Sequence, residues 1–299
     1  MKVFLYTTFA LIAFAFNSIF CRLALRGDEA DAVGFTAVRL ASGAVALVLI
    51  SLVCRSPRVS KGLTRTSDER PSLTRGPLHA GNWPSALLLF AYAICFSFAY
   101  LGLTAGTGAL ILFGSVQMTM IAVTLFRGER PRLLEWLGLA AAVIGLVYLV
   151  LPGLASPPLN SSLLMAAAGA SWGLYTLRGK ASTDPLGQTT GNFIRTLPFA
   201  AVIAVIFLPN LHLSTRGILL AVLSGAVTSG IGYTVWYAAL KHHTATRAAV
   251  LQLAVPVITA IIGVLFLAET ADIRLVIAAL LILGGIGLTI VGRNAEARA

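Results

Sequence analysis

Two arginines interrupt apolar segments of the chain that are otherwise almost free of charge. Arg39 and Arg195 lie six and nine residues from the start of their segments. A guanidinium at that depth could attract the carboxylate or phosphate of a ligand. We favour a structural role, in which each side chain extends toward a helix end and links neighbouring helices, and keep anion binding as the alternative.

Aromatic side chains recur three or four residues apart, the spacing that places residues on one face of a helix. They form three groups, which are Tyr92 with Phe96, Trp172 with Tyr175, and Tyr233 with Trp236 and Tyr237. Facing rings could bind an apolar or aromatic metabolite, but a stripe of rings serves equally well as core packing or lipid contact. The sequence leaves both interpretations open.

Three of the amide side chains in these segments are candidates for a binding role: Asn17, Gln117 and Gln252. An amide offers donors and an acceptor, so these residues could hydrogen-bond a zwitterionic head group. Hydrogen bonds between helices would satisfy them just as well. We treat the amides and the aromatic residues together as candidate substrate-binding residues.

Other reactive groups are missing from the apolar segments. No Asp or Glu lies in the middle of one, and Glu129 and Glu269 lie at segment ends. A carrier that exchanges cations for protons needs a buried carboxylate, so this class is disfavoured. The four histidines fall between segments, the three cysteines show no CxxC spacing, and neither HExxH nor GxSxG occurs. We therefore expect no catalytic residue, metal or cofactor, and predict that the protein is not an enzyme.

The composition indicates a membrane protein. Of the 299 residues 58% are hydrophobic and only 11% are charged, with a mean hydropathy of +0.88. Soluble domains carry roughly 25% charged residues, so much of this chain must face lipid. A membrane-spanning helix needs about 20 apolar residues. Ten segments meet or approach that length: 3–21, 33–54, 83–103, 105–126, 134–151, 159–177, 186–208, 217–240, 245–268 and 273–292.

Basic residues are distributed unevenly between the loops. If the N-terminus is cytoplasmic, sixteen Lys and Arg residues lie on the inner side and four on the outer side. Short loops rich in Lys and Arg stay inside, so both termini are predicted to be cytoplasmic. The net charge of +11 is spread over these loops and not gathered on one domain, so nucleic acid is not an expected partner.

The two halves of the chain repeat. At an offset of 156 residues Arg22 superposes on Arg178 and Arg39 on Arg195, and at an offset of 140 Glu129 superposes on Glu269. The difference falls in the basic loop 55–82, which we interpret as a cytoplasmic insertion. Each repeat holds five spans, so the second enters the membrane from the opposite side. Inverted repeats are typical of alternating-access transporters, with the substrate site between the halves.

Several motifs resemble the drug/metabolite transporter superfamily, in particular its ten-helix carriers built from two EamA-type domains. The resemblance covers about 5–150 and 160–292. The motifs are Ser171-Trp172-Gly173, Arg39 and Arg195, Tyr237 to Leu240, Ala245 to Ala249, Pro256, Leu267-Ala268-Glu269, and Gly284 to Gly287. The first half departs from this pattern at Asn17 and Gln117, which we place near the membrane midplane.

The resemblance implies an all-α membrane protein of ten transmembrane helices in two inverted five-helix repeats, at 1–152 and 159–293. It also implies that the first, third, fourth, sixth, eighth and ninth helices line a central cavity. Relatives export amino acids and other metabolites, and distant branches carry sugar phosphates or nucleotide sugars.

We therefore predict a secondary carrier in a bacterial inner membrane that exports small neutral or zwitterionic metabolites. The alternative is an exchanger of anionic, phosphorylated metabolites that uses Arg39 and Arg195. The predicted partners are a small-molecule substrate and the lipid bilayer. Apolar character gives no information about oligomeric state, and a monomer is compatible with the sequence.

Overall fold

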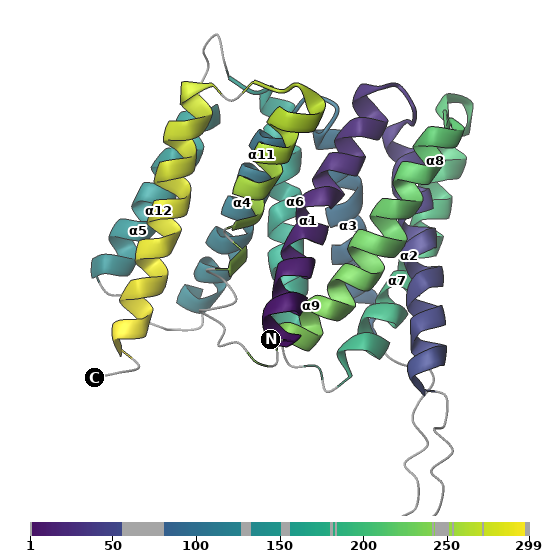
Figure 1. Cartoon of the computed structure of the whole chain (residues 1–299), viewed down its shortest axis with the longest axis horizontal. Coiled ribbons are helices and arrows are strands. Elements are labelled where there is room, and N and C mark those ends of the chain that lie inside the picture. The colour runs from purple at the N-terminus through teal and green to yellow at the C-terminus, as the bar shows by residue number, and fades with distance from the viewer. Residues whose placement is uncertain are drawn as a thin grey trace, which may run out of the picture.

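The described part of the chain is almost entirely helical (Figure 1). The computed structural model describes residues 2–55, 81–126, 133–150, 156–179, 182, 184–240, 242, 251–252, 254–270 and 272–296. In these residues the strand-like pairing is one isolated bridge between Ala30 and Leu213. The predicted all-α fold is confirmed.

The helices follow the predicted segments. The first half contains α1 (Lys2–Arg26), α2 (Ala32–Arg55), α3 (Trp83–Ala99), α4 (Ala105–Phe126) and α5 (Leu133–Val150). The second half contains α6 (Leu159–Gly179), α7 (Pro185–Ile206), the short η1 (Leu208–Asn210), α8 (Thr215–Val222), η2 (Leu223–Ile231), α9 (Gly232–Leu240), α11 (Ala254–Leu267) and α12 (Ile273–Glu296). Most of the predicted insertion at 55–82, and residues 245–250 of the ninth predicted span, lie outside the described residues.

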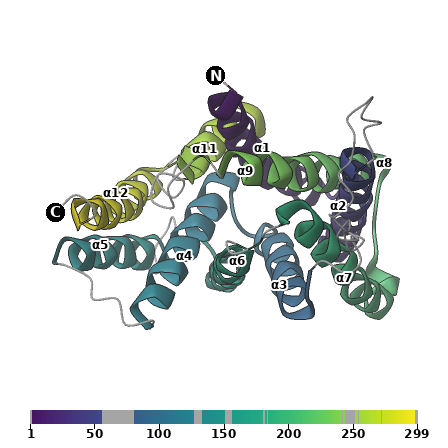
Figure 2. The same ribbon diagram turned by 90° about the horizontal axis from the view of Figure 1, so that it is seen from below.

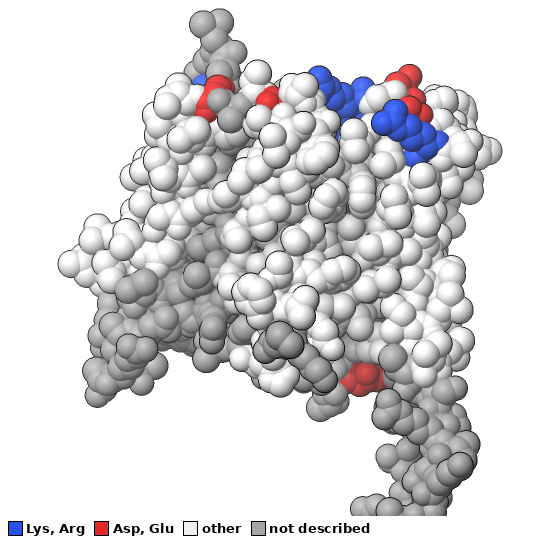
Figure 3. Space-filling view, in the orientation of Figure 1, with Lys and Arg blue, Asp and Glu red and all other residues white. Residues whose placement is uncertain are grey.

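Five described segments are long and apolar enough to cross a membrane. They are Val3–Arg26, Ala32–Val53, Ala105–Val123, Pro185–Ile206 and Thr215–Ala239. Shorter apolar helices occupy Trp83–Ala99, Trp136–Leu149, Ala254–Leu267 and Ile273–Leu288. On the face shown in Figure 3, charged side chains gather along one edge and the described surface below it is nearly free of charge. These features are those of an integral membrane protein.

The helices stand in two rows (Figure 2). In the first row, α1 packs against α11, η2 and α9, and α2 packs against η2 and α8. In the second row, α6 packs against α4 and α3, and α7 packs against α3. Across the rows α12 contacts α5, α11 contacts α4, and α2 contacts α7. The start of α1 and the end of α12 lie at the same edge of the molecule (Figure 1).

The eighth span is one continuous rod made of α8, η2 and α9. Its middle part, η2, is a π-helix of nine residues, a wider turn that often occurs at functional sites. Gly225 of η2 packs directly on α2, where an added side chain would overlap the carbonyl of Arg39 and the hydroxyl of Ser42. The small residue therefore lets the two backbones approach closely, as expected of glycine in membrane helices.

Candidate functional site

A small cavity lies at the centre of the bundle, between five helices. Its lining comes from α1, α3, α4, α6 and α9, and consists of Phe14, Asn17, Ser18, Tyr92, Phe96, Leu112, Phe113, Trp172 and Tyr233. The described lining contains no charged side chain. Five of the residues predicted from the sequence meet here: Asn17, Tyr92, Phe96, Trp172 and Tyr233.

Aromatic rings form a continuous wall of this cavity. Trp172 lies between Tyr92 and Tyr233, with both ring centroids 4.9 Å from its own. Tyr92 packs against Phe96 at 5.4 Å and Tyr233 against Phe14 at 5.7 Å. These five rings are buried in the protein. Their burial excludes lipid contact for this set and is compatible with both core packing and ligand binding.

Asn17 is the centre of the polar part of the site. Its amide nitrogen donates to the hydroxyl of Tyr92 at 3.1 Å, and its oxygen accepts from Ser224 at 2.6 Å and Thr228 at 3.3 Å. Both hydroxyl donors belong to η2. The amide thus connects α1 to α3 and to the π-helical part of the eighth span.

Arg39 lies behind the aromatic wall and is 2% exposed. Its Nη2 donates to the hydroxyl of Tyr92 at 3.0 Å and to Ser229 at 3.5 Å, while its Cζ lies 5.2 and 5.0 Å from the ring centroids of Tyr92 and Phe96. Arg39 does not extend to a helix end, because these contacts hold the guanidinium in the interior. They do link α2 to α3 and η2, which agrees with the predicted contact between neighbouring helices.

The charge of Arg39 is not balanced nearby. Among the described residues, the ion pairs join Arg22 to Glu269 and Arg216 to Glu29, and no carboxylate pairs with Arg39. Its Nη1 is buried without a hydrogen-bond partner in the same part of the chain. A buried charge lacking a counter-ion is costly, so the interior behind the cavity favours an anionic group.

Arg195 does not share this environment. It is half-buried, donates to the carbonyl of Gly191 at 2.9 Å, and lies 6.0 Å from the ring centroid of Trp83. Trp83 is more than half exposed and is the first residue of α3. The two arginines related by the repeat therefore have different surroundings, and only Arg39 adjoins the central cavity.

The other predicted residues lie outside the cavity lining. Tyr175 and Tyr237 line a second, smaller cavity with Ser85, Thr189 and Asn192. Trp236 is buried and contacts the ring of Phe14 at 5.8 Å, Gln117 is buried in α4, and Gln252 is half-buried.

Four lining residues were not predicted: Phe14, Ser18, Leu112 and Phe113. Phe14, Asn17 and Ser18 follow the same three- and four-residue spacing as the aromatic groups, so the signal for two of them was present in the sequence. Leu112 and Phe113 belong to an unbroken apolar run, which carries no such signal.

In this conformation the cavity is too small for a metabolite. The space available to the centre of a water-sized sphere is about 20 Å³ in the central cavity and about 10 Å³ in the second. The first value is that of roughly one water molecule. A metabolite therefore enters only after the surrounding helices separate.

Comparisons with known proteins agree with this architecture. A family model described as "EamA-like transporter family" matches residues 159–291. The chain is 44% identical over 296 residues to the "Uncharacterized protein PA1977" of Pseudomonas aeruginosa, which covers 99% of this chain and 97% of that protein. An "Uncharacterized transporter" of Archaeoglobus fulgidus is 26% identical over 215 residues, which cover 69% of this chain and 76% of that protein.

A solved structure described as "Crystal structure of protein" shares the fold. It superposes with a TM-score of 0.60 at 18% sequence identity, over 96% of each chain. The fold, the apolar helices and the sequence matches lead to one conclusion: residues 159–291 belong to the EamA-like transporter family, and the chain is a membrane transporter.

Proposed function

We propose that the protein exports small zwitterionic metabolites, amino acids or their relatives, through the central cavity. One observation carries the substrate class: an uncharged, ring-lined cavity borders a buried guanidinium without a described counter-ion. The proposal therefore assigns one end of the substrate to Arg39 and the other to the aromatic wall.

The substrate carboxylate is assigned to Arg39. The guanidinium already contacts Tyr92 and Phe96, which separate it from the cavity. A small movement of these rings would let a carboxylate reach the free Nη1 and form a charge-assisted hydrogen bond. The gain is large because the guanidinium has no carboxylate partner among the described residues.

The substrate ammonium is assigned to the rings. An ammonium group is attracted to the faces of Trp and Tyr, and Tyr92, Trp172 and Tyr233 lie together on one wall. The described lining offers no carboxylate to a purely cationic substrate. A zwitterion satisfies both ends of the site, whereas a cation would face Arg39 unpaired.

The mechanism we propose is alternating access by two inverted repeats, 1–152 and 159–293. The packing supports this division, because exchanging α1 with α6, α2 with α7, the eighth span with α3, α11 with α4 and α12 with α5 reproduces the main helix contacts. The cavity lies between helices of both repeats. Cytoplasmic termini and outward transport belong to the same proposal.

The alternative of a phosphorylated-anion exchanger depends on both arginines acting at one site. Arg195 lies against Trp83 and does not line the cavity. The single positive charge of Arg39 would balance only one of the two negative charges of a phosphate group. The zwitterion is the better match to the charges of the site.

The test is thermal unfolding of the detergent-purified protein with matched ligands. A ligand that binds only the folded state raises the melting temperature. Neutral amino acids are compared with the amines that lack only the carboxylate, and with sugar phosphates. We expect stabilisation by an amino acid, none by its amine, loss of the effect in Arg39→Gln, and retention in Arg195→Gln. Stabilisation by sugar phosphates that disappears in both arginine variants would establish the exchanger instead.

A further inference from the structure

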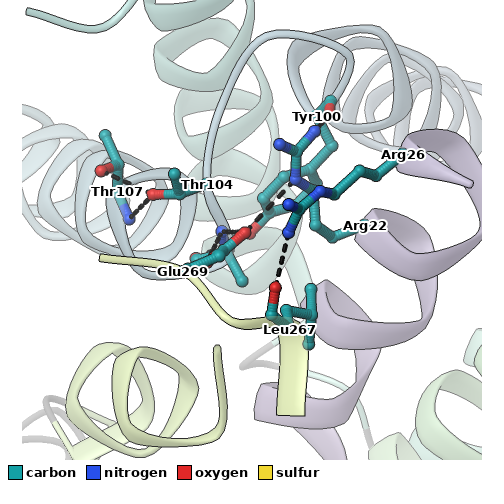
Figure 4. A network of polar contacts seen from close by, with 8 residues as sticks. Arg22, Arg26, Tyr100, Thr104, Thr107, Leu267 and Glu269 are labelled. Atoms are coloured by element: carbon teal, nitrogen blue, oxygen red, sulfur yellow. Dashed lines mark hydrogen bonds and ion pairs between the residues drawn. The ribbon is translucent and has the colours of Figure 1, made fainter. Parts of the chain in front are cut away.

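A polar network lies at the edge of the molecule where α1 and α11 end and α3 turns into α4 (Figure 4). Its centre is Glu269, which follows α11 after a turn at Ala268 with φ of +50°. Glu269 accepts from the backbone N–H of Ala105 with both carboxylate oxygens, at 3.1 and 2.8 Å, and from Nε of Arg22 at 3.3 Å. We name this group of contacts the rim network.

Two arginines of α1 complete the rim network. Nη1 of Arg22 donates to the carbonyl of Tyr100 at 2.9 Å, and Nη1 of Arg26 donates to the carbonyl of Leu267 at 2.6 Å. The contacts of Glu269 and Arg26 join the two halves of the chain, whereas the bond from Arg22 to Tyr100 lies within the first half. Separating the halves at this edge must break the contacts of Glu269.

The rim network is connected to the lining of the central cavity through one ring contact. Tyr100 packs its ring against Phe96 with 4.8 Å between centroids, and Phe96 lines the cavity. Ile19, Ala105 and Leu267 form a small buried cluster beside these contacts, and Ser18, the neighbour of Ile19, lines the cavity. The polar contacts and this cluster are thus joined to the cavity lining through Tyr100 and Ile19.

We propose that the ion pair between Glu269 and Arg22 is the lock that keeps the substrate path closed at this edge. The Glu269 and Arg22 side chains are only 6% and 14% exposed, so the pair is shielded from solvent. It also caps α4, because the carboxylate holds the first N–H of that helix. Opening releases Glu269, while Arg22 stays with Tyr100. The proposal rests on alternating access, not on the class of substrate.

The experiment measures access to Ser18 by chemical labelling. Ser18→Cys serves as reporter in a chain with Cys21, Cys54 and Cys95 replaced by Ala. A charged, membrane-impermeant methanethiosulfonate reagent is applied to right-side-out and to inside-out vesicles. In Glu269→Gln we expect labelling from the side of the rim network to rise about five- to thirtyfold, the factor produced by losing one or two kcal/mol. Labelling from the opposite side should fall or stay unchanged.

The matched control is Glu29→Gln. Glu29 lies at the same edge and pairs with Arg216 across the two halves, but its contacts are with α8 and its neighbouring loop. We expect no change in labelling. If Glu269→Gln does not fold, Arg22→Gln replaces it, because it breaks the ion pair and leaves Glu269 on the N–H of Ala105.

The outcomes distinguish failure of the proposed lock from failure of the proposed alternating-access mechanism. An unchanged rate in both rim variants, with labelling that still responds to a stabilising amino acid, overturns the lock and leaves alternating access standing. A reporter that stays unreactive from both sides in every variant and with every ligand overturns alternating access as well. A rise that Glu29→Gln reproduces shows general loosening of the edge and also overturns the lock.

Discussion

Asn17 shows how one side chain holds the site together. Its three hydrogen bonds reach Tyr92, Ser224 and Thr228, and Tyr92 in turn accepts from Arg39. The amide thus fixes the position of a ring in the cavity wall and, through it, the guanidinium behind that wall. The geometry of this part of the cavity lining therefore depends on the amide of Asn17.

Replacing Asn17 by Ala removes the acceptor of the Ser224 hydroxyl, whereas Thr228 still donates to the carbonyl of Ser224 and Tyr92 still accepts from Arg39. An unsatisfied buried polar group costs about 1–3 kcal/mol, so we expect a lower melting temperature and weaker stabilisation by amino acids. Thermal unfolding with and without ligand measures both effects. The exposed Asn160, replaced by Ala, is the control and should change stability by less than about 0.5 kcal/mol. Equal melting temperatures for the two variants would contradict the role given to Asn17.

Residue types and spacing predicted the composition of the site better than its geometry. The three- and four-residue spacing correctly brought Tyr92 to Phe96, and Asn17 was singled out by its amide. The depth of Arg39 was predicted wrongly. Its position in the sequence would allow the side chain to reach a helix end, but hydrogen bonds to α3 and η2 hold it in the interior. Such partners are distant in sequence, and no single-sequence pattern identifies them.

At the scale of elements, the close contact between η2 and α2 sets the position of the polar face of the eighth span. Gly225 lies against the backbone at Arg39. Ser224, Thr228 and Ser229 of the same π-helix contact Asn17 and Arg39. Helix spacing and site geometry are therefore coupled at one glycine.

Gly225→Ala should separate these elements. The added methyl group overlaps the Arg39 carbonyl, and overpacking of this kind costs about 1–3 kcal/mol. We expect a lower melting temperature and loss of ligand stabilisation. Gly284→Ala is the matched control, because nothing lies within 4 Å of its added carbon atom, and better helix propensity should keep or slightly raise stability. Similar losses in both variants would show that the contact at Gly225 is unimportant.

The helices themselves were the most predictable elements, since the length of each apolar run reports the thickness of the membrane. The π-helical turns of η2 were not predicted. The π-helical turns replace ordinary α-helical turns without changing the apolar pattern of the sequence. The sequence of Leu223–Ile231 therefore does not differ from that of an ordinary membrane-spanning α-helix.

At the scale of the whole molecule, both ends of the described chain lie at one edge and the charges of the rim network at the other (Figures 1 and 4). From the count of basic residues we predict that the edge with the termini faces the cytoplasm. The rim network would then close the outer side, and the conformation seen here would open inward first.

Reporter fusions test this orientation. A fluorescent protein fused after Ala299 should be bright, and alkaline phosphatase at the same position should be inactive. Alkaline phosphatase fused after Leu211, in the loop that precedes α8, should be active because this loop is predicted to lie outside. The opposite pattern at both positions would reverse the orientation and place the rim network on the cytoplasmic side.

The size of the central cavity also has a consequence for the cell. A space for about one water molecule, walled by aromatic rings, cannot admit a hydrated ion, and stripping an ion of its water in such a setting is prohibitively costly. We therefore expect that the carrier does not conduct ions in this conformation, and that a membrane containing many copies of it stays electrically insulating.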